Sequence, residues 1–87
     1  MLKIERSLNG RVLFSLAGRI ESEHVPELQR LLSLEKGHRR IAFDLTDVTL
    51  IDREVMKFLA RCEADSIGLE NCPLYLRQWI DRENKRG

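Results

Sequence analysis

The side chains that could carry acid–base, nucleophilic or metal chemistry are few and scattered. His24 and His38 lie far apart, and neither has a carboxylate or thiol at a catalytic spacing. Together with Cys62 and Cys72 they match no pattern of metal ligands. The five glycines stand singly, so no phosphate-binding loop is indicated. We therefore expect a protein that is not an enzyme and that holds no metal and no cofactor.

One stretch, residues 43–55, gathers acidic and hydroxyl side chains where an expected strand leads into an expected helix. Thr46 and Thr49 fall in the connection, and Asp52 stands just before the helical pattern begins. Aspartate is favoured at this position because its carboxylate accepts hydrogen bonds from the unpaired N–H groups of the first turn. Ile51 and Met56 flank the helix start as a hydrophobic pair. This end of the molecule is the strongest candidate site.

The elements that must position this stretch follow from the hydrophobic spacing of the first half of the chain. Apolar residues alternate on both sides of Asn9-Gly10, which predicts a β-hairpin, and Gly18 is expected to end its second strand. Residues 25–32 repeat at helical spacing with Pro26 in the first turn, and Gly37 is expected to close this segment.

The second half repeats the pattern of strand, connection and helix. Residues 40–45 predict a strand parallel to the one before the first helix, and residues 46–50 predict a loop. A helix should run from Asp52 to a left-handed cap at Gly68. Residues 73–76 then predict a fourth strand, and residues 78–87 a helical or frayed tail in which Trp79 and Ile80 dock.

The expected fold is α/β, in the order β-β-α-β-α-β with a helical tail. We expect a mixed four-stranded sheet with the helices mainly on one face. The opposite face should be open and should show Arg11, Leu13, Ser15, Arg40, Ala42 and Asp44.

Length and charge narrow the functional classes. The chain has 87 residues with 15 basic and 14 acidic side chains, a net charge of +1. We expect a single domain, with a core at about residues 2–77, small enough to gain from a partner or a homodimer. Near-neutrality does not favour nucleic-acid binding, and no apolar run reaches the roughly 18 residues of a membrane span. Two cysteines fit a reduced, cytoplasmic setting.

Residues 2–77 resemble the STAS domain, the fold of the bacterial anti-sigma factor antagonists. The resemblance rests on Leu16-Ala17-Gly18-Arg19-Ile20-Glu21, on Val25-Pro26-Glu27-Leu28 and on the stretch from Phe43 to Val55. In that family an Asp-Ser-Ser-Gly or Asp-Ser-Thr-Gly sequence opens the second helix. Here Asp52 is present, Arg53 and Glu54 replace the two hydroxyl residues, and Val55 replaces the glycine.

The resemblance implies a non-enzymatic, protein-binding regulator of transcription. Its partner would be an anti-sigma factor that is also a serine kinase of the histidine-kinase-like ATPase type. That kinase phosphorylates the family's hydroxyl residue, which is absent here, so binding is not expected to be switched at Arg53 or Glu54. The alternative partner is the ATPase of an ABC-type lipid transporter, on which a small STAS subunit docks. A ligand-binding domain or small enzyme on the open sheet face is a further alternative.

The replaced positions leave three interpretations open. Glu54 is an ordinary first-turn acid, part of a constitutive interaction surface, or a partial mimic of phosphoserine whose charge a pair with Lys57 would mute. Thr49 and Thr46 are alternative phospho-acceptors. The surface expected to meet the partner is formed by Thr49, Asp52, Arg53, Glu54, Lys57 and Arg61.

Overall fold

The computed structural model describes residues 1–35 and 40–86, and these include every residue of the candidate site. The elements follow one another as β1 (Leu2–Leu8), β2 (Val12–Ile20), the 3-10 turn η1 (Ser22–His24), α1 (Val25–Ser33), β3 (Ile41–Ile51), α2 (Arg53–Ala64), β4 (Gly68–Glu70) and α3 (Leu74–Arg86). The predicted end of the first segment at Gly37 lies outside the described residues.

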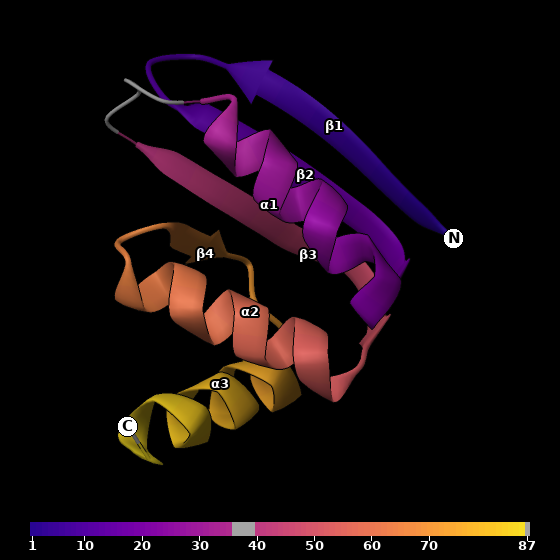
Figure 1. Cartoon of the computed structure of the whole chain (residues 1–87), viewed down its shortest axis with the longest axis vertical. Helices are drawn as coiled ribbons and strands as arrows, with labels where there is room; N and C mark the ends of the chain where they lie inside the picture. Colours follow the sequence, from indigo (N-terminus) through magenta and orange to yellow (C-terminus); the bar gives the residue numbers. More distant parts are fainter. Residues whose placement is uncertain (36–39, 87) are drawn as a thin grey trace.

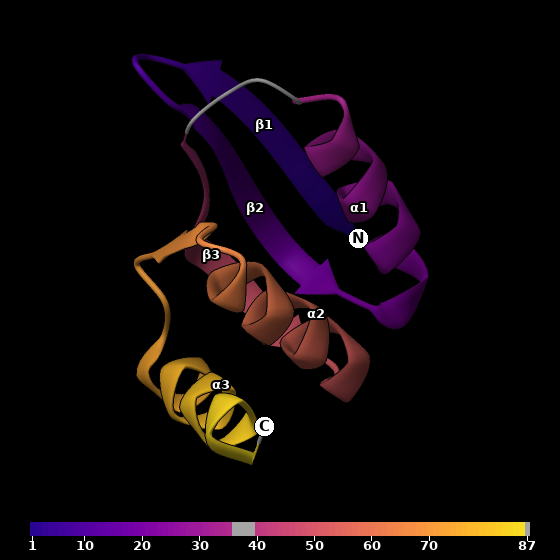
Figure 2. The ribbon, with the colours of Figure 1, turned by 60° about the vertical axis from the view of Figure 1, so that its left-hand side comes forward.

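In the described residues the strands form one mixed sheet in the order β1-β2-β3-β4. β1 and β2 pair antiparallel around a turn in which Gly10 adopts a positive φ of 76°, which confirms the predicted hairpin. β3 is parallel to β2, and β4 is parallel to β3. Figures 1 and 2 show α2 lying between α1 and α3, with α1 and α2 packed on the same face of the sheet. The predicted fold class is confirmed.

The core lies between this face of the sheet and the helices. Its largest fully buried side chains come from β2, β3 and all three α-helices: Phe14, Phe43, Leu16, Ile20, Leu28, Leu45, Met56, Leu59, Leu76, Ile80, Val12 and Val55. Phe43 is the centre of an aromatic group, with ring centroids 5.9 Å from Phe14 and 6.3 Å from Phe58. The contact between Phe43 and Phe58 packs α2 against the sheet.

The predicted loop at residues 46–50 is wrong, because β3 continues as a strand to Ile51. This half of β3 pairs with the second half of β2, with Ala17 opposite Asp47 and Ile20 opposite Ile51. Two register shifts in the pairing let Val48 and Ile51 point into the core while the residues between them stay exposed. Such irregularities hide the strand from a search for strict alternation.

Two glycines do not end the elements that they were expected to end. β2 continues past Gly18 to Ile20, and Gly18 has a φ of +94° at a point where an added Cβ would collide with the backbone carbonyl of Met1. α2 ends at Ala64, and Ser66 takes the left-handed conformation predicted for Gly68. Gly68 instead opens β4, close to the side chain of Ala42.

The fourth strand and the third helix are both displaced from their predicted positions. β4 is only three residues long and precedes Pro73, whereas residues 74–76 already belong to α3. Leu76 and Ile80 are four residues apart and both fully buried, which is helical spacing. The predicted docking of Trp79 and Ile80 is confirmed.

The face of the sheet opposite the helices is less open than predicted. Arg11, Leu13, Ser15 and Asp44 are half-buried, and Arg40 is exposed. Ala42 is buried, because β4 lies beside it with Gly68 at close range.

Candidate functional site

Asp52 connects the two loops that follow the parallel strands β2 and β3. It is the N-cap of α2, with an extended backbone (φ −93°, ψ 177°), and its Oδ1 accepts the N–H of Val55 at 3.0 Å. Its second oxygen, Oδ2, accepts the N–H of Ser22 at 2.7 Å. One carboxylate therefore fixes both the start of α2 and the start of η1. The sequence predicts the first contact, whereas the second depends on the parallel pairing of β2 with β3.

His24 has a structural role that sequence reasoning missed. Its Nδ1 accepts the backbone N–H of Glu21 at 2.9 Å, and its own N–H donates to the carbonyl of Glu21 at 2.8 Å. These two bonds close the turn η1 that leads into α1. Because the imidazole is engaged in this turn, it supports the loop that Asp52 holds.

The first turn of α2 places the replaced family positions on different sides. Arg53 and Glu54 are exposed, whereas Val55 is fully buried in the core. The valine that stands in place of the glycine therefore does not project toward a partner.

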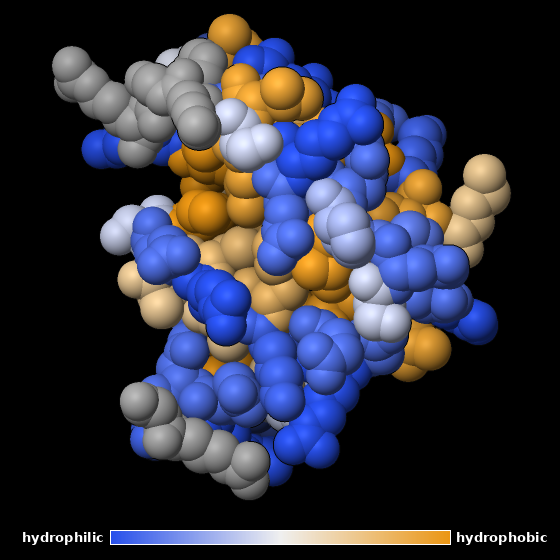
Figure 3. Space-filling model, in the orientation of Figure 1, coloured by the Kyte–Doolittle hydropathy of each residue, from blue (hydrophilic) through white to orange (hydrophobic). Residues whose placement is uncertain are grey.

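Three residues of the predicted surface lie around one shallow hollow between α1 and α2. Its volume is about 180 Å³, and it is lined by Gln29, Glu54, Lys57, Phe58 and Arg61. Figure 3 shows apolar surface between the hydrophilic ridges of α1 and α2. The predicted pair between Glu54 and Lys57 is not present among the ion pairs of the described residues. Both charges are thus available to a partner.

Arg53 faces a second hollow, between α2 and α3, of about 260 Å³. Its lining residues are Arg53, Met56, Trp79, Arg82 and Glu83. The structure therefore divides the predicted surface between the two sides of α2.

The two threonines differ in their surroundings. Thr49 is exposed in the last part of β3, three residues before Asp52. Thr46 donates both its hydroxyl (2.6 Å) and its backbone N–H (3.0 Å) to Oδ1 of Asp44, which also accepts from Asn71. These bonds hold the pKa of the Asp44 carboxyl below its usual value. Thr46 belongs to this polar group near β4.

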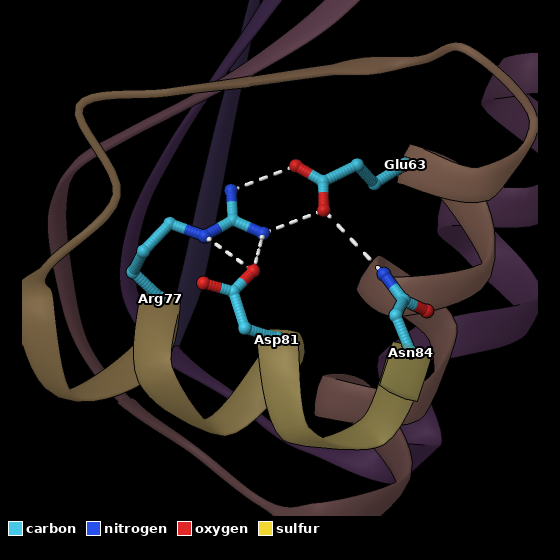
Figure 4. Close-up of polar contacts among 4 residues, drawn as sticks. All are labelled: Glu63, Arg77, Asp81 and Asn84. Carbon is cyan, nitrogen blue, oxygen red and sulfur yellow. Dashed lines mark hydrogen bonds and ion pairs between the residues drawn. The ribbon is translucent and has the colours of Figure 1, made fainter. Parts of the chain in front are cut away.

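A polar cluster that the sequence analysis did not identify fastens α3 to α2 (Figure 4). The guanidinium of Arg77 donates to both oxygens of Glu63, at 2.7 and 2.5 Å, and to Asp81 at 2.7 Å. Asn84 makes a longer bond to Glu63 at 3.4 Å. The two carboxylates raise the pKa of Arg77. In the sequence, only the spacing of four residues between Arg77 and Asp81 could have indicated part of this cluster, because residues at this spacing are neighbours on a helix surface.

Within residues 1–35 and 40–86, no three or more His, Cys, Asp or Glu side chains gather in a group that could hold a metal ion. Among the same residues, no helix is long and apolar enough to cross a membrane.

Comparison with known proteins identifies the fold. No protein-family model and no curated protein matches the chain. The crystal structure of Mglu matches 82% of the chain with a TM-score of 0.57 and 28% identity, and the chain spans 19% of Mglu. An uncharacterized protein of the DUF3478 family with a SpoIIAA-like fold, from Shewanella loihica PV-4, matches 94% of the chain. That match has a TM-score of 0.53 and 17% identity, and it covers 74% of the Shewanella protein. The chain thus has a SpoIIAA-like fold.

Proposed function

We propose that this chain is a non-enzymatic, protein-binding regulator of the STAS type, related in function to bacterial anti-sigma factor antagonists. Its partner is an anti-sigma factor of the histidine-kinase-like ATPase type in the cytoplasm. The observation that carries the proposal is the exposed charged surface at the start of α2, set on a SpoIIAA-like fold. Glu54, Lys57 and Arg61, which follow one another along α2, line one hollow, and none of the ion pairs among the described residues joins them.

Binding at this surface is constitutive. Neither Arg53 nor Glu54 can accept a phosphoryl group on a hydroxyl, since neither side chain has one. Glu54 places one negative charge near the positive end of the α2 dipole, a contribution of about 0.3–1 kcal/mol. A phosphoserine would place about −1.5 to −2 charge there with three acceptor oxygens. Glu54 therefore supplies a fixed and weaker version of that charge.

The geometry of Asp52 supports the same proposal. The carboxylate holds the loops after β2 and β3 together, so the first turn of α2 is presented to a partner in one arrangement. A surface that is already ordered loses less conformational entropy when it binds.

Affinity capture from extract of the native cell tests the proposal. The wild-type chain should retain an anti-sigma factor with an ATPase fold, identified by mass spectrometry, and Glu54→Lys should lose it. Glu5→Lys is the matched control, because its side chain is 68% exposed on β1 and its pair with Lys3 is a weak surface pair.

Three outcomes would decide against parts of the proposal. Capture that is equal for Glu54→Lys and wild type would remove this surface from the interface. Specific capture of an ABC transporter ATPase would replace the proposed partner with the lipid-transport alternative. A phosphate gained by the wild type from the captured kinase, and lost in Thr49→Val or Thr46→Val, would show that binding is switched at a threonine.

A further inference from the structure

The hollow between α2 and α3 carries two positive charges that have no ion-pair partner in the described residues. Arg53 stands in the first turn of α2 and Arg82 in the second half of α3, and both line the hollow. Neither is joined to a carboxylate in the part of the chain that the structure describes. Glu83 lines the same hollow without pairing to them, so the local balance is positive.

The accessible apolar surface of the hollow comes mainly from Trp79, which is half-buried against the core. Met56 also lines the hollow but is only 1% exposed. The indole N–H of Trp79 makes no hydrogen bond among the described residues and is not buried, so it is available as a donor. Tyr75 lies one turn earlier on the same side of α3 and is 49% exposed. The chain's one tryptophan lines the same hollow as these arginines.

The walls of the hollow are held in place from the other side of α3. Arg77 there donates to Glu63 of α2 and to Asp81 of its own helix, and Leu76 and Ile80 are fully buried between the two sides. The side chains of the hollow are consequently mounted on two helices that are fixed relative to each other.

We propose that this hollow binds a segment of a partner protein in which carboxylate side chains flank a leucine-like apolar one. Charge complementarity selects the carboxylates, and the accessible part of the Trp79 ring accepts the apolar side chain. Tryptophan and arginine are among the residues that contribute most energy at protein interfaces. A volume of about 260 Å³ accommodates one or two side chains, not a nucleic-acid backbone with its bases. The inference rests on the proposed function in that it assumes a protein-binding module, and it adds the chemistry of one contact.

Trp79 provides the assay, since it is the only tryptophan in the chain. Its fluorescence is followed while the full chain is titrated with a capped octapeptide in which glutamates flank two leucines. We expect a saturable change with this peptide, and none when glutamine or lysine replaces the glutamates.

Variants then locate the site. Arg53→Gln and Arg82→Gln should each weaken peptide binding by about threefold to fivefold, as expected for a partly exposed ion pair. Arg30→Gln removes an equally exposed positive charge from α1 and should leave binding unchanged. Circular dichroism checks that each variant keeps the helical content of the wild type.

Several results would overturn the inference. These are the absence of a saturable change at millimolar peptide, equal weakening by Arg30→Gln, or equal binding of a single-stranded oligonucleotide or of phosphatidylglycerol vesicles. Failure here and failure of the proposed function can be told apart. Loss of a captured partner with Glu54→Lys but no peptide binding refutes only this inference, whereas peptide binding without that partner refutes only the proposed function.

Discussion

Removing the Asp52 carboxylate should destabilise the fold at two points at once. Asp52→Ala leaves the N–H of Val55 without its cap and the N–H of Ser22 without its acceptor. Asp52→Ser separates the two effects, because a serine hydroxyl caps a helix almost as well but cannot reach both donors. The stability that Asp52→Ser loses relative to the wild type therefore measures the contact between the two loops, separately from the helix cap.

The expected magnitudes follow from the geometry. Loss of an N-cap to alanine costs about 1 kcal/mol. The bond from Ser22 goes to a charged acceptor and is short at 2.7 Å, but it is exposed, so we assign it about 0.5–1 kcal/mol, below the value for a buried charged bond. Asp52→Ala should thus lower the free energy of unfolding by about 2 kcal/mol, and Asp52→Ser by about 1 kcal/mol.

Urea denaturation followed by circular dichroism measures both values in one experiment. Ser22→Pro provides the cross-check, because proline removes the donor N–H at the first position of η1, where its fixed φ is tolerated. Adding Asp52→Ser to Ser22→Pro should then cost nothing further. If Asp52→Ser is as stable as the wild type, or if the two changes are fully additive, the proposed contact between the loops is refuted.

Four other predictions test separate parts of the structure. Gly18→Ala should destabilise the chain by at least 1 kcal/mol in thermal unfolding, because alanine is strained at a φ of +94° and its Cβ would collide with backbone. Arg77→Met should cost about 1–2 kcal/mol in urea, since two carboxylates lose their shared partner. Burial raises the pKa of the Cys62 thiol to about 12, so a disulfide reagent at pH 8 should label Cys72 first and Cys62 only after unfolding. The lowered pKa of Asp44 favours the folded state above about pH 4. That contribution is lost on acidification, so Asp44→Asn should lose less stability than the wild type between pH 5 and pH 3.

The elements that could be predicted from the sequence are those with a regular hydrophobic repeat. The hairpin around Asn9-Gly10, the helix that begins at Val25 and the cap at Asp52 depend on neighbours within a few residues. Local spacing is enough to determine them, because the same few residues make both the pattern and the contact.

The elements that were misplaced depend on contacts across the sheet. β4 has three residues, too few to show alternation, and it exists because Gly68 can lie against Ala42 of β3. The second half of β3 follows a pairing with two register shifts, which no alternating pattern reveals. Glycine at positions 18 and 68 was interpreted as the end of an element, although its role there is to permit close approach between chain segments.

The candidate site also depends on contacts that the sequence pattern does not reveal. The sequence places the residues of the predicted surface just before α2 or along it, but it does not show how that surface is divided between two hollows. That division depends on where α3 packs, and α3 begins at Leu74, inside the segment expected to be a strand. Trp79 and Arg82 therefore could not be connected with Arg53 before the position of α3 was known.

The valine at position 55, in the first turn of α2, also affects the stability of the helix. On the alignment given by the resemblance, Val55 stands where the family has a glycine, and its side chain is fully buried. Glycine inside a helix costs about 1 kcal/mol relative to alanine, and full burial of a valine side chain contributes about 1.5–3 kcal/mol. Val55 therefore makes the first turn of α2 more stable than a glycine would, while Arg53 and Glu54 remove the hydroxyl groups next to it. Both changes act in the same direction, toward a helix start with one fixed arrangement and one fixed set of charges. Under the proposed function a kinase finds no acceptor at Arg53 or Glu54, so a phosphorylation switch at this end would need another hydroxyl, such as that of Thr49.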